Sequence, residues 1–116
     1  MQSACDAAKY ACAYLTGTKP PSHPDTEKTM DEVRARIRTV IGYLETFKRE
    51  QFAGAGERKV APPWLGGKWL TASDYLFQAS LPNFYFHMTT AYDILRHSGV
   101  DTLGKSVFIG DLPVRD

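Results

Sequence analysis

The sequence predicts an all-α protein in which about three long helices pack as an up-down bundle. Hydrophobic residues recur at helical spacing in two long segments, 29–48 and 81–97, and a third segment, 3–16, is rich in alanine. The 116 residues, 43% of them hydrophobic, are enough for one core and too few for two. We therefore expect a single domain over residues 1–116.

The first predicted helix covers residues 3–16 and ends at Gly17, a residue type that favours helix ends. Small side chains form one stripe on it, which predicts a close helical neighbour. The stripe consists of Ala4, Ala8, Ala11 and Leu15. Prolines in the next segment, 18–25, remove backbone donors and predict a connection between antiparallel helices.

The second predicted helix begins at Thr29, which forms a capping-box pattern with Glu32. Hydrophobic residues then recur at helical spacing to about Lys48. These residues are Val33, Ile37, Val40, Ile41, Leu44 and Phe47. Three arginines at alternate positions between 34 and 38 are scattered around this helix, which indicates a solvated face rather than a nucleic-acid surface.

The segment 53–70 is interrupted by glycines and prolines, so it cannot form a long helix. A short β-hairpin that turns at Gly66 and Gly67 fits it, and so does an irregular loop. Either structure is expected to bury Trp64 and Trp69 over one end of the bundle, where they could also line a ligand pocket. Thr71 is then expected to cap the next helix.

The last predicted helix, 81–97, carries an apolar stripe that must face other helices. The stripe consists of Phe84, Met88, Ala91 and Leu95. Pro82 either kinks a longer helix or occupies the first turn of a new one that Ser80 caps. Gly99 ends the helix, and residues 100–116 are expected to be an extended tail. Its apolar residues are expected to pack locally: Val107, Phe108 and Ile109.

Charge and composition exclude several classes of partner. The net charge of +1, from 14 basic and 13 acidic residues, provides no field that would recruit nucleic acid or an anionic membrane. No apolar run approaches the ~20 residues of a membrane span, and no signal-peptide pattern follows Met1, so we expect a cytoplasmic protein.

Cys5 and Cys12 would lie ~10 Å apart on one helix, beyond the ~7 Å limit of a disulfide, so we expect reduced thiols.

The last helix also holds the one plausible chemical site. His87 lies at the margin of the apolar stripe, and Asn83 lies one turn earlier on the same edge. A histidine in such a place is more often a hydrogen-bonded structural residue than a metal ligand. His97 lies in the last turn, where the helix dipole favours a positive charge, so we expect its side chain to cap the free carbonyl groups there. The chain has no G-x-S-x-G, P-loop or RNA-binding pattern.

Several segments spread along the chain are similar to one known family. They are residues 6–9, 19–21, 43–45, 66–67, 75–76, 82–87 and 91–96, of which Pro-Asn-Phe-Tyr-Phe-His at 82–87 is the most specific. They resemble a bacterial family of unknown function in the DinB/YfiT-like superfamily. This resemblance implies an up-down four-helix bundle, often dimeric. It also implies a divalent metal held by three histidines, one from the second helix and an H-x-x-x-H pair from the last.

The chain departs from that family in two ways. It begins inside what would be the second helix, so the family's first helix would be missing. The apolar face left open would favour a homodimer, or a fragment completed by another protomer. The H-x-x-x-H pair is here Asn83 and His87, and the other helix offers only Asp6. Asparagine is a poor ligand for zinc or nickel, although an Asp, Asn and His set would suit a harder ion.

Two functions from different classes follow. The first is a non-catalytic oligomeric binding or scaffold protein, without a cofactor and open to a small-molecule ligand. The alternative is a degenerate metal-dependent enzyme of the hydrolase or thiol transferase type. In it, Asp6, Asn83 and His87 would hold zinc, nickel or manganese as a Lewis acid. The incomplete ligand set favours the first function.

Overall fold

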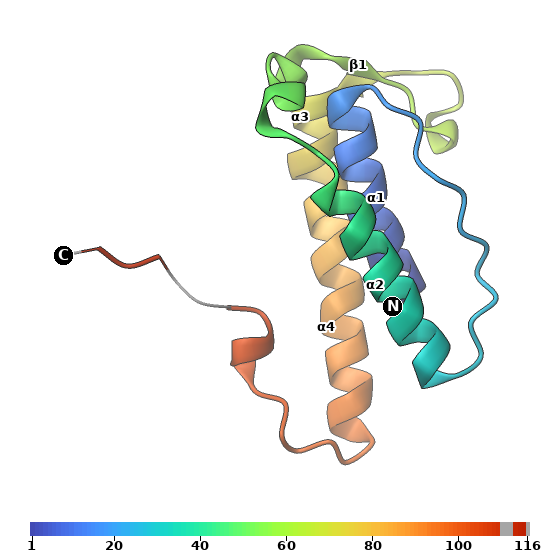
Figure 1. Cartoon of the computed structure of the whole chain (residues 1–116), viewed down its shortest axis with the longest axis vertical. Helices are drawn as coiled ribbons and strands as arrows, with labels where there is room; N and C mark the ends of the chain where they lie inside the picture. The colour runs from blue at the N-terminus through green and yellow to red at the C-terminus, as the bar shows by residue number, and fades with distance from the viewer. Residues whose placement is uncertain (110–112, 116) are drawn as a thin grey trace.

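The computed structural model describes residues 1–109 and 113–115, and this part of the chain is mostly helical. Its long helices are α1 (Gln2–Thr16), α2 (Met30–Glu45) and α4 (Leu81–His97), which run alongside one another (Figure 1). The prediction of a mainly helical fold with about three long helices is therefore confirmed for the described residues.

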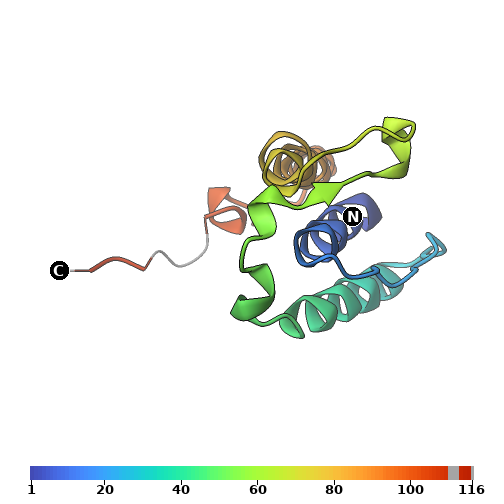
Figure 2. The same cartoon turned by 90° about the horizontal axis from the view of Figure 1, so that it is seen from above.

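Helix α1 lies between α2 and α4, as the view from above shows (Figure 2). This central position explains why its small residues are buried on more than one side. Ala4 and Ala11 of the predicted stripe are buried, and so are Ala7 and Ala13, which lie off the stripe. Gly17 ends α1 in the left-handed conformation, with a φ of 71°, as predicted.

Helix α2 begins with the predicted capping box. The hydroxyl oxygen of Thr29 accepts the backbone N–H of Glu32 at 3.2 Å, and the Glu32 carboxylate accepts the backbone N–H of Thr29 at 2.8 Å. The helix ends at Glu45 rather than near Lys48, because the Thr46 hydroxyl donates to the Tyr43 carbonyl at 2.7 Å. Two 3₁₀ turns follow, η1 (Arg49–Phe52) and η2 (Ala55–Glu57).

The segment before the last helix forms the predicted hairpin in a reduced form. Strands β1 (Lys59–Val60) and β2 (Leu70–Thr71) pair antiparallel, with Lys59 opposite Thr71 and Val60 opposite Leu70. The 3₁₀ turn η3 (Pro63–Leu65) lies between them, and Gly66 and Gly67 after it have positive φ values of 59° and 87°. Only glycine adopts this pair of conformations without strain, so these residues set the turn.

The expectation that both tryptophans are buried is wrong. Trp64 is 65% exposed and Trp69 is 55% exposed. The Trp69 ring instead lies 4.2 Å from the ammonium nitrogen of Lys59, at the hairpin surface. The hairpin is anchored to the core by a smaller residue, Val60, which packs with Ala72 and Tyr75.

The last helix is continuous through Pro82, so Ser80 does not cap a new one. The short helix α3 (Ala72–Asp74), capped by Thr71 as predicted, leads into a π turn, η4 (Tyr75–Ser80), and then into α4. The backbone N–H of Leu81 bonds to the carbonyl of Leu76, five residues earlier. The π turn widens the helix where Pro82 has no N–H to donate.

The end of α4 has the hydrogen bonds of a Schellman motif around Gly99, whose φ is 92°. Gly99 donates to Arg96 at 3.1 Å and Val100 donates to Leu95 at 3.0 Å. Arg96 rather than His97 supplies the side-chain hydrogen bonds, to the carbonyls of Val100 and Asp101. The guanidinium reaches these carbonyls because the chain turns back past Gly99.

The segment after α4 is not extended throughout its described part. It contains a 3₁₀ turn, η5 (Lys105–Val107), after which the Phe108 ring packs on the Tyr92 ring at 5.4 Å between centroids. Residues 110–112 and 116 of the predicted tail lie outside the described residues. The local packing predicted for Phe108 is therefore found, against α4.

Two further predictions can be compared with the described residues. Cys5 and Cys12 are free, and burial raises the pKa of both thiols. In the described part of the chain, every helix is too short or too polar to cross a membrane.

Candidate functional site

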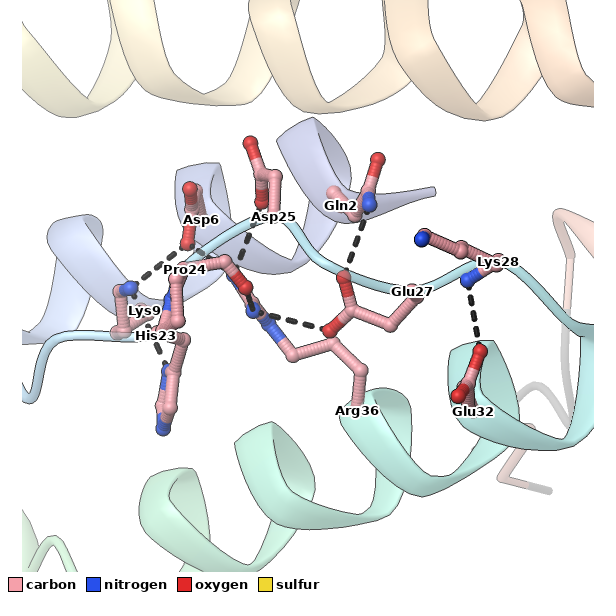
Figure 3. A network of polar contacts seen from close by, with 10 residues as sticks. All are labelled: Gln2, Asp6, Lys9, His23, Pro24, Asp25, Glu27, Lys28, Glu32 and Arg36. Atoms are coloured by element: carbon pink, nitrogen blue, oxygen red, sulfur yellow. Dashed lines mark hydrogen bonds and ion pairs between the residues drawn. The ribbon is translucent and has the colours of Figure 1, made fainter.

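A network of charged side chains joins α1, α2 and the segment between them (Figure 3). Its centre is Arg36 of α2, which is only 6% exposed. The guanidinium lies 3.0 Å from the Asp6 carboxylate, 3.2 Å from Glu27 and 3.5 Å from Asp25. It also donates to the carbonyl of Pro24 at 3.2 Å. The prediction that the arginines of α2 form a solvated face is therefore wrong for Arg36.

Lys9 is the second buried cation of this network, at 1% exposure. Its ammonium nitrogen lies 2.7 Å from the Asp6 carboxylate and 3.5 Å from Nδ1 of His23. An ammonium group can only donate, so Nδ1 of His23 must accept and carry no proton. The segment 18–28 is thus bound to α1 and α2 through polar contacts (Figure 3).

The contact between Lys9 and His23 predicts a pH dependence of stability. Burial lowers the pKa of His23 below its ordinary 6.5, and the charges of Lys9 and Arg36 lower it further, against smaller opposing effects of Asp6 and Glu27. The unfolded chain then binds more protons than the folded one. The free energy of unfolding should therefore fall as the pH drops below about 6.5, until the lowered pKa is passed.

The measurement is urea unfolding of the wild type and of His23→Gln at about pH 7.5 and about pH 5.5. The wild type should lose more stability than His23→Gln over this interval. His97→Gln is the matched control and should behave as the wild type. Equal losses in all three proteins would contradict the prediction.

The three residues proposed from the sequence as metal ligands do not bond to one another in the described structure. Asp6 directs its carboxylate to Lys9 and Arg36, on the side of α1 that faces α2. Asn83 is exposed on α4, and His87 is half-buried with its ring edge-to-face against Phe86, at 5.2 Å between centroids. Two cations already compensate the charge of the one carboxylate, which weakens it as a metal ligand.

No group of three or more histidine, cysteine, aspartate or glutamate side chains in the described residues is arranged to hold a metal ion. Asn83 instead lines a cavity of about 440 Å³ between α1, the hairpin and the last helix. The other lining residues are Ala7, Trp64, Tyr75, Ala79 and Ser80. Ser80 is buried, and its hydroxyl donates to the carbonyl of Ala7 at 3.1 Å.

A second cavity, of about 310 Å³, shares Trp64 and Tyr75 with the first and is otherwise lined by Tyr10, Tyr14 and Pro63. Of its residues, the sequence indicated only Trp64 as one that could line a ligand pocket. A further signal was the pair Tyr10 and Tyr14, which at i and i+4 lie on the same face of α1. Their rings lie 5.9 Å apart between centroids.

A third feature is a wholly apolar groove of about 280 Å³ between α1, α2 and α4. Met1, Ala4, Cys5, Ala8, Ile37, Val40, Ile41, Leu44, Phe84 and Met88 line it. A smaller apolar cleft continues it along α4 past Ala91 and Leu95. The stripe predicted on the last helix therefore lines the groove and the cleft instead of packing fully against a helix.

Comparison with known proteins gives the family. Residues 1–109 match the model of a family described as "Domain of unknown function (DUF1993)". The chain belongs to this DUF1993 family. Search of the curated proteins gave no match.

Among solved structures, the DUF1993 chain is similar to the 1.83 Å crystal structure of a DinB family member protein from Shewanella denitrificans. The two sequences are 44% identical, and the TM-score is 0.90. The match covers 99% of this chain and 65% of the other, so this chain spans less than two thirds of the length of that protein. The DinB-like resemblance found in the sequence is thereby confirmed.

Proposed function

We propose that this DUF1993 protein is a non-catalytic binding or scaffold protein that works as a cytoplasmic homodimer. The proposal rests on the apolar groove between α1, α2 and α4. We assign the groove to a second copy of the chain, so that each protomer completes a DinB-like four-helix bundle domain with an apolar helix of its partner.

The chemistry of the groove supports a helical occupant. All ten of its lining side chains are apolar or a cysteine, and the hydrophobic surface continues beyond the groove into the cleft along α4. Ile41 in the groove is 48% exposed, and Leu95 in the cleft on α4 is 39% exposed. Apolar surfaces of this extent usually mark protein interfaces. The same apolar chemistry on both copies lets one surface cover the other around a two-fold axis.

The test is the molar mass in solution of the wild type and of Met88→Glu. The wild type should have the mass of a dimer. Met88→Glu places a charge in the apolar groove, which is unfavourable unless the charge is paired, so this variant should shift to the monomer mass. Thr89→Glu, on the neighbouring exposed position of α4, is the matched control and should remain a dimer.

A monomeric wild type would overturn the assignment to a second copy. So would a dimer that Met88→Glu leaves intact, because the interface would then lie elsewhere. Circular dichroism of the two variants separates loss of the dimer from loss of the fold.

The alternative is a degenerate enzyme of the hydrolase or thiol transferase type that uses a divalent metal. Its support is the similarity to a DinB family member and the position of Asn83 at a cavity. Against it, the carboxylate of Asp6 is held by Lys9 and Arg36, so the set of Asp6, Asn83 and His87 does not fit a metal centre. We therefore derive no catalytic step from it.

Elemental analysis distinguishes the two functions. Protein purified without a chelator or an affinity tag, and then incubated with zinc, nickel and manganese, should retain far less than one metal ion per chain. One ion per chain that is lost in His87→Ala would overturn the non-catalytic assignment.

A further inference from the structure

The two cavities beside the hairpin differ in chemistry. The smaller one is lined by four aromatic rings and Pro63, and the larger one adds the polar side chains of Ser80 and Asn83. Trp64 and Tyr75 line both, so a ligand in the smaller cavity lies next to the larger one. None of these residues lines the apolar groove.

Three rings of the smaller cavity, from Tyr10, Tyr14 and Tyr75, pack against one another. Tyr75 packs edge-to-face on Tyr14, with centroids 5.0 Å apart and ring planes at 90°. Tyr10 lies nearly parallel to Tyr14, at 23°. Tyr10, Tyr14, Trp64 and Tyr75 thus line the cavity from more than one direction, which suits a round cation better than a flat ligand. Aromatic cages recognise quaternary ammonium groups.

The charges around the cavity are compatible with a cation. Burial raises the pKa of Tyr75 to about 12, and the neighbouring Tyr14 contributes, so the hydroxyl of Tyr75 keeps its proton at neutral pH. The ammonium group of Lys9 lies 4.8 Å from the centre of the Tyr10 ring, and its charge is paired with the Asp6 carboxylate. Trp64 is 65% exposed, so its ring is free to cover a ligand that enters.

We propose that Tyr10, Tyr14, Trp64 and Tyr75 form a cage for a small molecule with a quaternary ammonium head, whose polar end lies beside Ser80 and Asn83. The site deepens the binding role proposed above. Its failure is distinct from failure of the dimer, because the molar mass and the ligand affinity are measured separately.

The two tryptophans of the chain provide the readout. Choline is titrated into protein labelled with ¹⁵N, and the two indole N–H signals are followed by NMR; the Trp64→Ala and Trp69→Ala variants assign them. Choline should shift the Trp64 signal saturably and leave the Trp69 signal in place. Trp64→Ala should weaken binding about tenfold or more, the loss expected from removing one wall of the cage.

Two controls make the result specific. Trp69→Ala removes an exposed tryptophan of the same hairpin and should leave the affinity unchanged. The neutral isostere of choline, with a tert-butyl group in place of trimethylammonium, should bind about tenfold more weakly than choline. No saturable shift with choline, an equal affinity for the isostere, or equal effects of the two tryptophan substitutions would overturn the proposal.

Discussion

Replacing Arg36 with alanine is expected to lower the free energy of unfolding by about 3 kcal/mol. The substitution removes the cation at the centre of the network and the ion pairs of Asp6, Asp25 and Glu27 with it. Asp6 then keeps its pair with Lys9, and Glu27 keeps the hydrogen bond from the Gln2 amide. Loss of one partner from a buried ion pair costs about 3–5 kcal/mol. The lower end applies because Asp6 and Asp25 are 29% and 58% exposed and water screens their charges.

The matched control is Arg34→Ala, two residues earlier on α2. Arg34 pairs with Asp31 at 2.8 Å, but the two side chains are 60% and 91% exposed. Its loss should cost about 0.5 kcal/mol or less. Urea unfolding of both variants measures the difference. Similar losses in the two variants would contradict the structural role of the network.

Replacing Tyr75 with alanine is expected to lower the free energy of unfolding by about 3 kcal/mol. Tyr75 is 7% exposed and packs with Val60 and Ala72, where the hairpin meets the last helix. Loss of a buried aromatic ring costs about 3–5 kcal/mol, and the low end is expected because two cavities already adjoin this ring.

Phe77→Ala is the control for this second prediction. It removes a ring of similar size two residues later in the same π turn, where Phe77 is 65% exposed. It should change the stability by no more than about 0.5 kcal/mol. Thermal unfolding of the two variants makes the comparison. A loss of stability in Phe77→Ala as large as that in Tyr75→Ala would contradict the placement of Tyr75 in the core and of Phe77 at the surface.

The helices could be predicted from the sequence because their signals are local. The capping box of Thr29, the stop at Gly17 and the turn at Gly66 and Gly67 each depend on residues within a few positions of one another. The continuous helix through Pro82 was harder to predict. A missing N–H permits either a break or a wider turn, and the choice depends on packing of the whole helix.

The site features depend on residues that are distant in the sequence. Arg36 is contacted by Pro24, Asp25 and Glu27, which lie in or just after the segment 18–25 that the sequence identified only as a connection. The aromatic cage joins Tyr10 and Tyr14 of α1 to Trp64 of the hairpin. No pattern within a single helix or strand predicts that these residues lie together. Asp6 was predicted as a metal ligand from its position on the first helix. Its ion pairs with Lys9 and Arg36, which the sequence did not predict, make its carboxylate a poor ligand instead.

The π turn has a further consequence for the last helix, because it can take up a change in chain length. Each residue of an α-helix advances the side-chain direction by about 100°, so losing one residue from a regular α-helix turns the faces that follow by that angle. The segment Tyr75–Ser80 already holds an extra residue in its wider turn. Deleting one residue there would let the turn close to α-helical geometry, with Asn83 still at its cavity and Phe84 and Met88 still in the groove. The π turn thus makes this one segment tolerant of a change in length.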